Sequence, residues 1–182
     1  MIITSEMIAR RRAFLRPGYC TLADVGLEGE YVSPLQISSS SPTGPVLLAY
    51  HWLDAKSAIA NQVQLRECGY LKNITFNKVV DRALSICGLN RASIYMTQVF
   101  HLLPPTERSA YIPVKYVDAS FEEITCFELR GRKIITLGWQ AARACQRGGV
   151  EPSRTVSHPS ARGRSQEDKA GELAAAIKDL LD

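Results

Sequence analysis

A continuous apolar run at residues 46–50 constrains the fold more than any other stretch. The run reads VLLAY, and it follows a loop at 38–45 that is rich in serine and proline. Strands of a parallel sheet are buried on both faces, so they are apolar throughout instead of alternating between apolar and polar residues. We therefore predict that residues 46–50 form a central strand with helices packed on both sides.

The rest of the chain supplies further strands and helices in alternation. Residues 79, 80, 83, 84 and 87 are apolar at helical spacing, and Ser120-Phe121-Glu122-Glu123 matches a capping box that opens a helix. Such alternation predicts an α/β fold, a three-layer α/β/α sandwich around a four-stranded parallel sheet. The other predicted strands are 92–99, 133–137 and the segment that leads to His158, and the predicted helices are 5–14, 75–87, 120–129, 139–147 and 166–181.

Length and composition indicate one domain. The chain has 182 residues, of which 46% are hydrophobic and 22% charged, enough for a single core. We expect one domain over residues 1–182, with the helix and irregular segment of 1–45 packed on it. Because no apolar run is long enough to span a bilayer and the N-terminus lacks the features of a signal peptide, we expect a cytoplasmic monomer with no membrane partner.

The cysteines give no sign of a metal site. They are five in number, scattered, and contain no C-x-x-C pair. We therefore expect reduced thiols, no disulfide framework, no zinc site and no cofactor.

A histidine lies where the fourth predicted strand ends. His158 is followed by Pro159, which fixes a turn, and by Arg162 and Arg164. In open α/β sheets ligands bind at the carboxyl ends of the strands, so the turns at Asp54, Gln98, Gly138 and His158 should converge on one cleft. On this stretch alone, a histidine that caps a turn is the simpler interpretation.

Three further stretches carry a resemblance to a known family. Residues 88–99 (GLNRASIYMTQV) precede a proline pair at 104–105, residues 133–142 read KIITLGWQAA, and residues 157–160 read SHPS. In this order they resemble the uracil-DNA glycosylase superfamily, whose bacterial families four and five carry G-L-x-R-x-x-x-Y-x-T-N-x-V and an H-P-S motif. The resemblance covers roughly residues 46–182, and it implies a uracil-DNA glycosylase-like fold and a DNA partner.

Two positions depart from that pattern. The first motif of the family, G-x-D-P, G-x-N-P or G-E-x-P, is replaced here by Tyr50-His51-Trp52-Leu53-Asp54. The asparagine that reads the base in the family falls on Gln98, and cysteines at the spacing of the iron–sulfur forms are absent. Both changes lead us to expect weak or no excision of plain uracil and preference for another base.

The resemblance implies a set of catalytic roles. His158 would donate a hydrogen bond to the departing base. Asp54 would stabilise the sugar cation or orient water, although a helix cap or a surface charge explains it equally well. His51 is the alternative group for orienting water, and a packed or solvated side chain is the other interpretation of it.

The resemblance also implies base and backbone contacts. Gln98 would read a base edge or satisfy loop backbone, Tyr70 would stack on the base or be an ordinary half-buried tyrosine, and Trp52 would rebuild the pocket wall. A phosphate clamp is the expected role of the turn, although a solvated turn is the alternative. The residues of this clamp are Ser157, Pro159, Ser160, Arg162, Arg164 and Ser165.

These features predict a DNA glycosylase that flips out and excises a damaged or modified base, with a pyrimidine as the expected target. The net charge of +4 is compatible with nucleic acid. Three alternatives stay open: a defence enzyme that acts on hypermodified bases of phage DNA, a non-catalytic module that binds lesions, and a hydrolase of small nucleosides or nucleotides.

Overall fold

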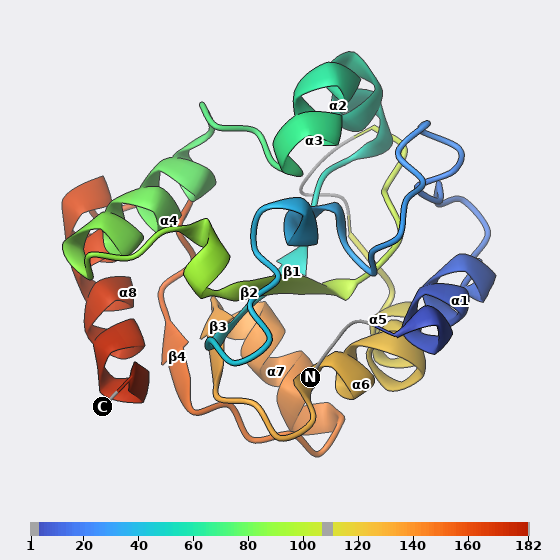
Figure 1. The fold of residues 1–182 in the computed structure, drawn as a ribbon. Helices are drawn as coiled ribbons and strands as arrows, with labels where there is room; N and C mark the ends of the chain where they lie inside the picture. Colours follow the sequence, from blue (N-terminus) through green and yellow to red (C-terminus); the bar gives the residue numbers. More distant parts are fainter. Residues whose placement is uncertain (1–3, 107–110, 182) are drawn as a thin grey trace.

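Four parallel strands form one sheet between two layers of helices (Figure 1). The computed structural model describes residues 4–106 and 111–181. The strands are β1 (Val46–His51), β2 (Tyr95–Phe100), β3 (Ile134–Leu137) and β4 (Arg154–Val156), in the order β2-β1-β3-β4. Val46 is paired with Tyr95 on one side and with Ile134 on the other. The predicted α/β fold with a central β1 is therefore confirmed.

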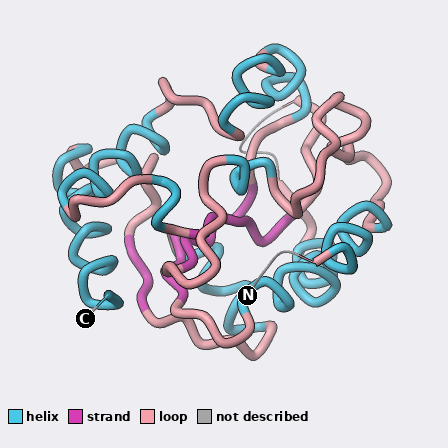
Figure 2. The backbone as a smooth tube through the Cα atoms, viewed as in Figure 1, coloured by secondary structure: helices cyan, strands magenta, loops and turns pink. Residues whose placement is uncertain are grey.

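The two faces of the sheet bury alternate residues of β1, β2 and β3, whereas only Val156 of β4 is buried. Leu47, Met96 and Ile135 face the layer made by α4 (Thr75–Ile86) and α8 (Gln166–Leu181). Neighbouring residues such as Val46, Leu48 and Val99 face the opposite layer, and Figure 2 shows these helices grouped on the two sides of the strands. The helices of that opposite layer are α1 (Ser5–Ala13), α5 (Val114–Ser120), α6 (Cys126–Leu129) and α7 (Trp139–Arg147).

Two short helices form a third cluster beyond the carboxyl end of β1. They are α2 (Ala55–Ala60) and α3 (Gln62–Cys68), and their buried residues meet the loop that precedes β1. The sequence did not predict them because their larger apolar residues do not share a buried face. Ile59 and Val63 are exposed, whereas Leu65 is fully buried.

The predicted capping box at Ser120 is wrong. The helix begins earlier, at Val114, and continues through the π-helical segment η3 (Phe121–Thr125) into α6. Ser120 is therefore an internal helical residue, fully buried, and its hydroxyl accepts a hydrogen bond of 3.1 Å from the backbone N–H of His101. The hydroxyl satisfies a buried donor on the end of β2 instead of capping its own helix.

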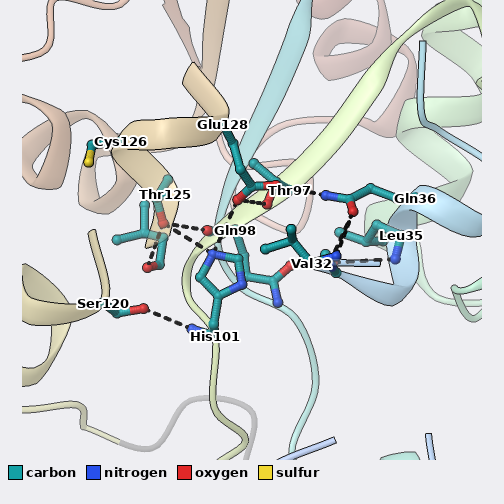
Figure 3. Close-up of polar contacts among 12 residues, drawn as sticks. Val32, Leu35, Gln36, Thr97, Gln98, His101, Ser120, Thr125, Cys126 and Glu128 are labelled. Carbon is teal, nitrogen blue, oxygen red and sulfur yellow. Dashed lines mark hydrogen bonds and ion pairs between the residues drawn. The ribbon is translucent and has the colours of Figure 1, made fainter. Parts of the chain in front are cut away.

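A buried carboxylate ties β2, α6 and a 3-10 helix together (Figure 3). Glu128 has no exposed surface, and it accepts hydrogen bonds from Tyr95 Oη (2.6 Å) and Gln36 Nε2 (2.8 Å) on one oxygen. Thr97 Oγ1 donates to the other oxygen at 2.8 Å, and His101 Nε2 lies 3.4 Å from it. Gln36 belongs to η1 (Pro34–Ile37), so the network fixes a loop that is distant in sequence. Buried polar groups of this kind are stable only when each is paired.

Glu128→Ala should destabilise the fold strongly. The substitution leaves the Tyr95 hydroxyl, the Thr97 hydroxyl and the Gln36 amide without their acceptor, and each such loss costs about 1–3 kcal/mol. We expect the free energy of unfolding, measured by urea denaturation, to fall by at least about 3 kcal/mol. Glu122→Ala is the matched control, because Glu122 lies on the exposed side of the same segment. Equal stability of the two variants would contradict this account.

Candidate functional site

A cavity of about 390 Å³ lies at the carboxyl edge of the sheet. Its walls come from the end of β1 with the following residues (Ala49–Leu53), from the start of α4 (Ile74, Phe76, Asn77), from Gln140 of α7 and from the His158 turn. The volume is at the lower end of the range for ligand pockets, about 300–1,000 Å³. The ends of β1, β3 and β4 therefore meet at one site. The sequence predicted that all four strand ends would do so, but the end of β2 at Gln98 does not line the cavity.

His158 is held as a neutral hydrogen-bond donor in this cavity. The backbone N–H of Ser160 donates to His158 Nδ1 at 3.1 Å, so the ring hydrogen of the neutral form is on Nε2. Burial lowers the pKa of His158, and the charge of Lys169 lowers it further. The imidazole thus stays uncharged at neutral pH with one N–H available to a ligand.

A glycine allows the end of β3 to approach His158. Gly138 has a φ of 96°, and a Cβ atom built there would lie 3.0 Å from the Cβ of His158. Any larger residue would be strained by its backbone and would press on the imidazole. The close contact places Gln140, two residues further on, beside the same cavity.

Aromatic rings form much of the remaining wall. The Phe76 ring centroid lies 5.5 Å from that of His158. Trp52 is fixed by a hydrogen bond of 3.1 Å from its Nε1 to the carbonyl of Gly69. A cavity lined by flat apolar rings with a few polar groups suits a small planar ligand.

The structure brings together some of the predicted site residues and separates others. His158, His51, Trp52 and Ser160 line the cavity. Asp54 does not, because it is the N-cap of α2, where Oδ1 accepts from Ser57 N at 2.8 Å and Oδ2 from Ser57 Oγ at 2.7 Å. The helix-cap interpretation of Asp54 therefore describes its position.

Gln98 and Tyr70 also lie outside the described cavity lining. Gln98 is 3% exposed, and its Oε1 accepts a hydrogen bond of 2.6 Å from Ser33 Oγ. The loop before η1 covers the end of β2, and this covering places the amide in the interior. The Tyr70 ring lies 3.6 Å from the guanidinium carbon of Arg91, a cation–π contact that holds it against α4.

Several cavity residues were not identified from the sequence, among them Phe76 and Gln140. Phe76 gave no signal beyond its place at the start of α4. Gln140 could have been found, because it follows the Gly138 turn at the carboxyl end of a predicted strand. In contrast to Gln98, its side chain is exposed at the cavity.

Some residues of the predicted phosphate clamp already bond to other parts of the protein, whereas Arg162 does not bond to the described residues. Arg164 Nη1 pairs with Glu172 and donates to Ser157 Oγ, and Ser165 caps α8 through Asp168. Pro159 is buried in the turn. Arg162 is exposed and makes no hydrogen bond or ion pair with the described part of the chain.

No protein-family model matches the chain, and no curated protein matches it. Within residues 4–106 and 111–181, no group of His, Cys, Asp and Glu side chains is placed to hold a metal ion. No helix in these ranges is long and apolar enough to cross a membrane. None of the described residues that line the cavity is an aspartate or a glutamate.

The lowered pKa of His158 predicts a pH-dependent stability. The unfolded chain titrates near the ordinary histidine pKa of about 6.5, so it binds more protons than the folded state once the pH falls below this value. The resulting loss of stability is absent well above pH ~6.5, grows as the pH falls, and is complete below the lowered pKa.

We expect His158→Asn to lose less unfolding free energy than the wild type between about pH 7.5 and about pH 5, measured by urea denaturation. Asparagine keeps an acceptor for the Ser160 N–H but does not titrate. Arg162→Ala, in the same loop, is the control and should follow the wild type. An unchanged pH dependence in His158→Asn would contradict the half-buried neutral imidazole.

Proposed function

We propose that this chain is a DNA glycosylase that binds a flipped-out base in the cavity and hydrolyses its N-glycosidic bond. The observation that carries this proposal is His158, a neutral imidazole with its hydrogen on Nε2, in a cavity walled by Trp52 and Phe76. The order of motifs shared with the uracil-DNA glycosylase superfamily supports the same reaction. Arg162, exposed beside the cavity, supplies a positive charge for the DNA backbone.

The reaction breaks the bond between the sugar C1′ and the base nitrogen. The electron pair of that bond leaves with the base, which becomes an anion, and the sugar becomes cationic. His158 Nε2–H donates a hydrogen bond to the anion as it forms, a kind of stabilisation worth about 10²- to 10³-fold in rate. Water then adds to C1′ and releases a proton to solvent, leaving an abasic site. His51 lines the same cavity and is our proposed group for orienting that water.

Base recognition is assigned to Gln140 instead of Gln98. Its amide offers a donor and an acceptor at the cavity, whereas the Gln98 oxygen is engaged by Ser33. Trp52 and His51 replace the small turn of the family and make this wall bulkier. We therefore propose a modified or damaged base as the substrate, with hypermodified cytosines of phage DNA as the bolder assignment.

The residues that line the cavity also support a second candidate function, a non-catalytic module that binds lesions. Because no described lining residue is a carboxylate, the site could bind a flipped base without cleaving it. Duplex and single-stranded oligonucleotides carrying different lesions, scored for abasic sites after alkali treatment, separate the two functions. Tight binding of a lesion with no abasic product would establish the binding module.

His158→Ala should slow base release by about 10²- to 10³-fold while DNA affinity changes little, because the hydrogen bond strengthens mainly in the transition state. Single-turnover excision and a binding titration measure the two quantities. Asp54→Asn is the companion variant, since its oxygen can still accept from Ser57 N. Near wild-type excision by Asp54→Asn is expected, and a loss as large as that of His158→Ala would return the catalytic role to Asp54.

Arg162→Ala should weaken DNA binding more than Arg164→Ala. Arg162 is available to a phosphate, whereas Arg164 already pairs with Glu172. Losing one phosphate contact lowers the slope of log affinity against log salt concentration by about one, for all DNA sequences alike. Affinity measured over a series of salt concentrations tests this, and an unchanged slope in Arg162→Ala would exclude the phosphate contact.

A further inference from the structure

Trp139 is an exposed residue next to the cavity and does not belong to the hydrophobic core. Trp139 is 61% exposed and opens α7, between Gly138, which contacts His158, and Gln140, which lines the cavity. Folding does not require an indole at this exposed position, because α7 packs on the sheet through Ala141, Ala144 and Cys145. The indole is therefore available to a ligand outside the fold.

An arginine is stacked on this ring. The guanidinium carbon of Arg143 lies 4.4 Å from the centroid of Trp139, one helical turn further along α7. Two exposed arginines further along the chain are neutralised: Arg147, at the end of α7, pairs with Asp118, and Arg154, at the start of β4, pairs with Asp179. Arg143 makes no ion pair among the residues that the structure describes. The pair thus presents an aromatic surface and an uncompensated positive charge together.

We infer that Trp139 and Arg143 form a stacking platform for an unpaired nucleobase of single-stranded DNA, next to the nucleotide that enters the cavity. This inference rests on the proposed DNA partner. Every base has a π-face that stacks on aromatic rings, and arginine adds a cation for the adjoining phosphate. Bases inside a duplex already stack on each other, so the platform selects single strands.

The surroundings favour a negatively charged partner. The exposed neighbours of Trp139 on α7 are the polar Gln140 and the positively charged Arg143. Arg162, exposed two residues after the cavity-lining Ser160, adds a second positive charge. The charge pattern thus matches a polyanion that passes the cavity mouth.

Tryptophan fluorescence gives a direct test. The chain has two tryptophans, so Trp52→Phe leaves Trp139 as the only indole. Titration of this variant with a short oligothymidylate should quench its emission, because a base stacks on the ring. In the otherwise wild-type chain, Trp139→Ala should lower the affinity for the same oligonucleotide by roughly 5- to 150-fold, and Trp139→Phe should lower it less.

Val63→Ala is the matched control. It removes an exposed apolar side chain from a different helix, α3, and should bind as the wild type does. Thermal unfolding of each variant confirms that it is folded. Wild-type affinity in folded Trp139→Ala, or emission unchanged at saturating oligonucleotide, would overturn the inference. So would equal loss of affinity for a fully paired duplex of the same length.

The outcome is separable from that of the proposed function. If Trp139→Ala loses single-strand affinity while no lesion yields an abasic site, the platform is established and the glycosylase proposal fails. If the wild type releases a base but Trp139→Ala retains full single-strand affinity, the platform fails and the glycosylase proposal stands.

Discussion

The hydrogen bonds of the buried Glu128 carboxylate fix how β2, α6 and η1 are arranged. The carboxylate has no exposed surface, so its oxygens must be satisfied from within the protein. Burial, and then the charge of Glu128, raise the pKa of Tyr95, which keeps its hydroxyl a donor. Gln36 connects this network to η1, and the adjacent Leu35 lines the cavity. A polar group in the core thereby sets the position of a loop at the site.

The site itself depends on close approach between the ends of β3 and β4. Gly138 permits His158 to lie against it, and the Ser160 N–H then selects the tautomer with hydrogen on Nε2. Lys169 of α8 donates to the carbonyl of Ala161 at 2.9 Å and so anchors the loop that follows. The donor is thus positioned by backbone and helix contacts of a rigid framework, as a preorganised site requires.

The sequence predicted the layers of the fold where the spacing of apolar residues matches the pattern of burial. The apolar run of β1 is explained only by a strand buried on both faces, and the apolar face of α4 only by a helix packed on the sheet. Local pattern was insufficient where a side chain had two possible partners. Ser120 matches a helix cap but accepts from the backbone of His101, and the oxygen of Gln98, for which a base contact was one of two interpretations, accepts from Ser33. Such choices depend on which distant loop covers a strand end, and local pattern carries no information about that.

The composition of the cavity wall determines which step the protein can assist in the proposed reaction. A leaving base carries negative charge, and a nearby carboxylate would oppose it, whereas the described lining offers a neutral imidazole, amides and aromatic rings. The proposed reaction therefore relies on assistance to the departing base, and not on activation of an attacking water by a carboxylate base. Under the proposal, cleavage adds two roles to simple binding: the hydrogen bond from His158 to the departing base and the orientation of water by His51. Since the proposed hydrogen bond from His158 would strengthen as charge develops on the base, a cavity that binds a flipped base would gain catalytic power mainly from this group.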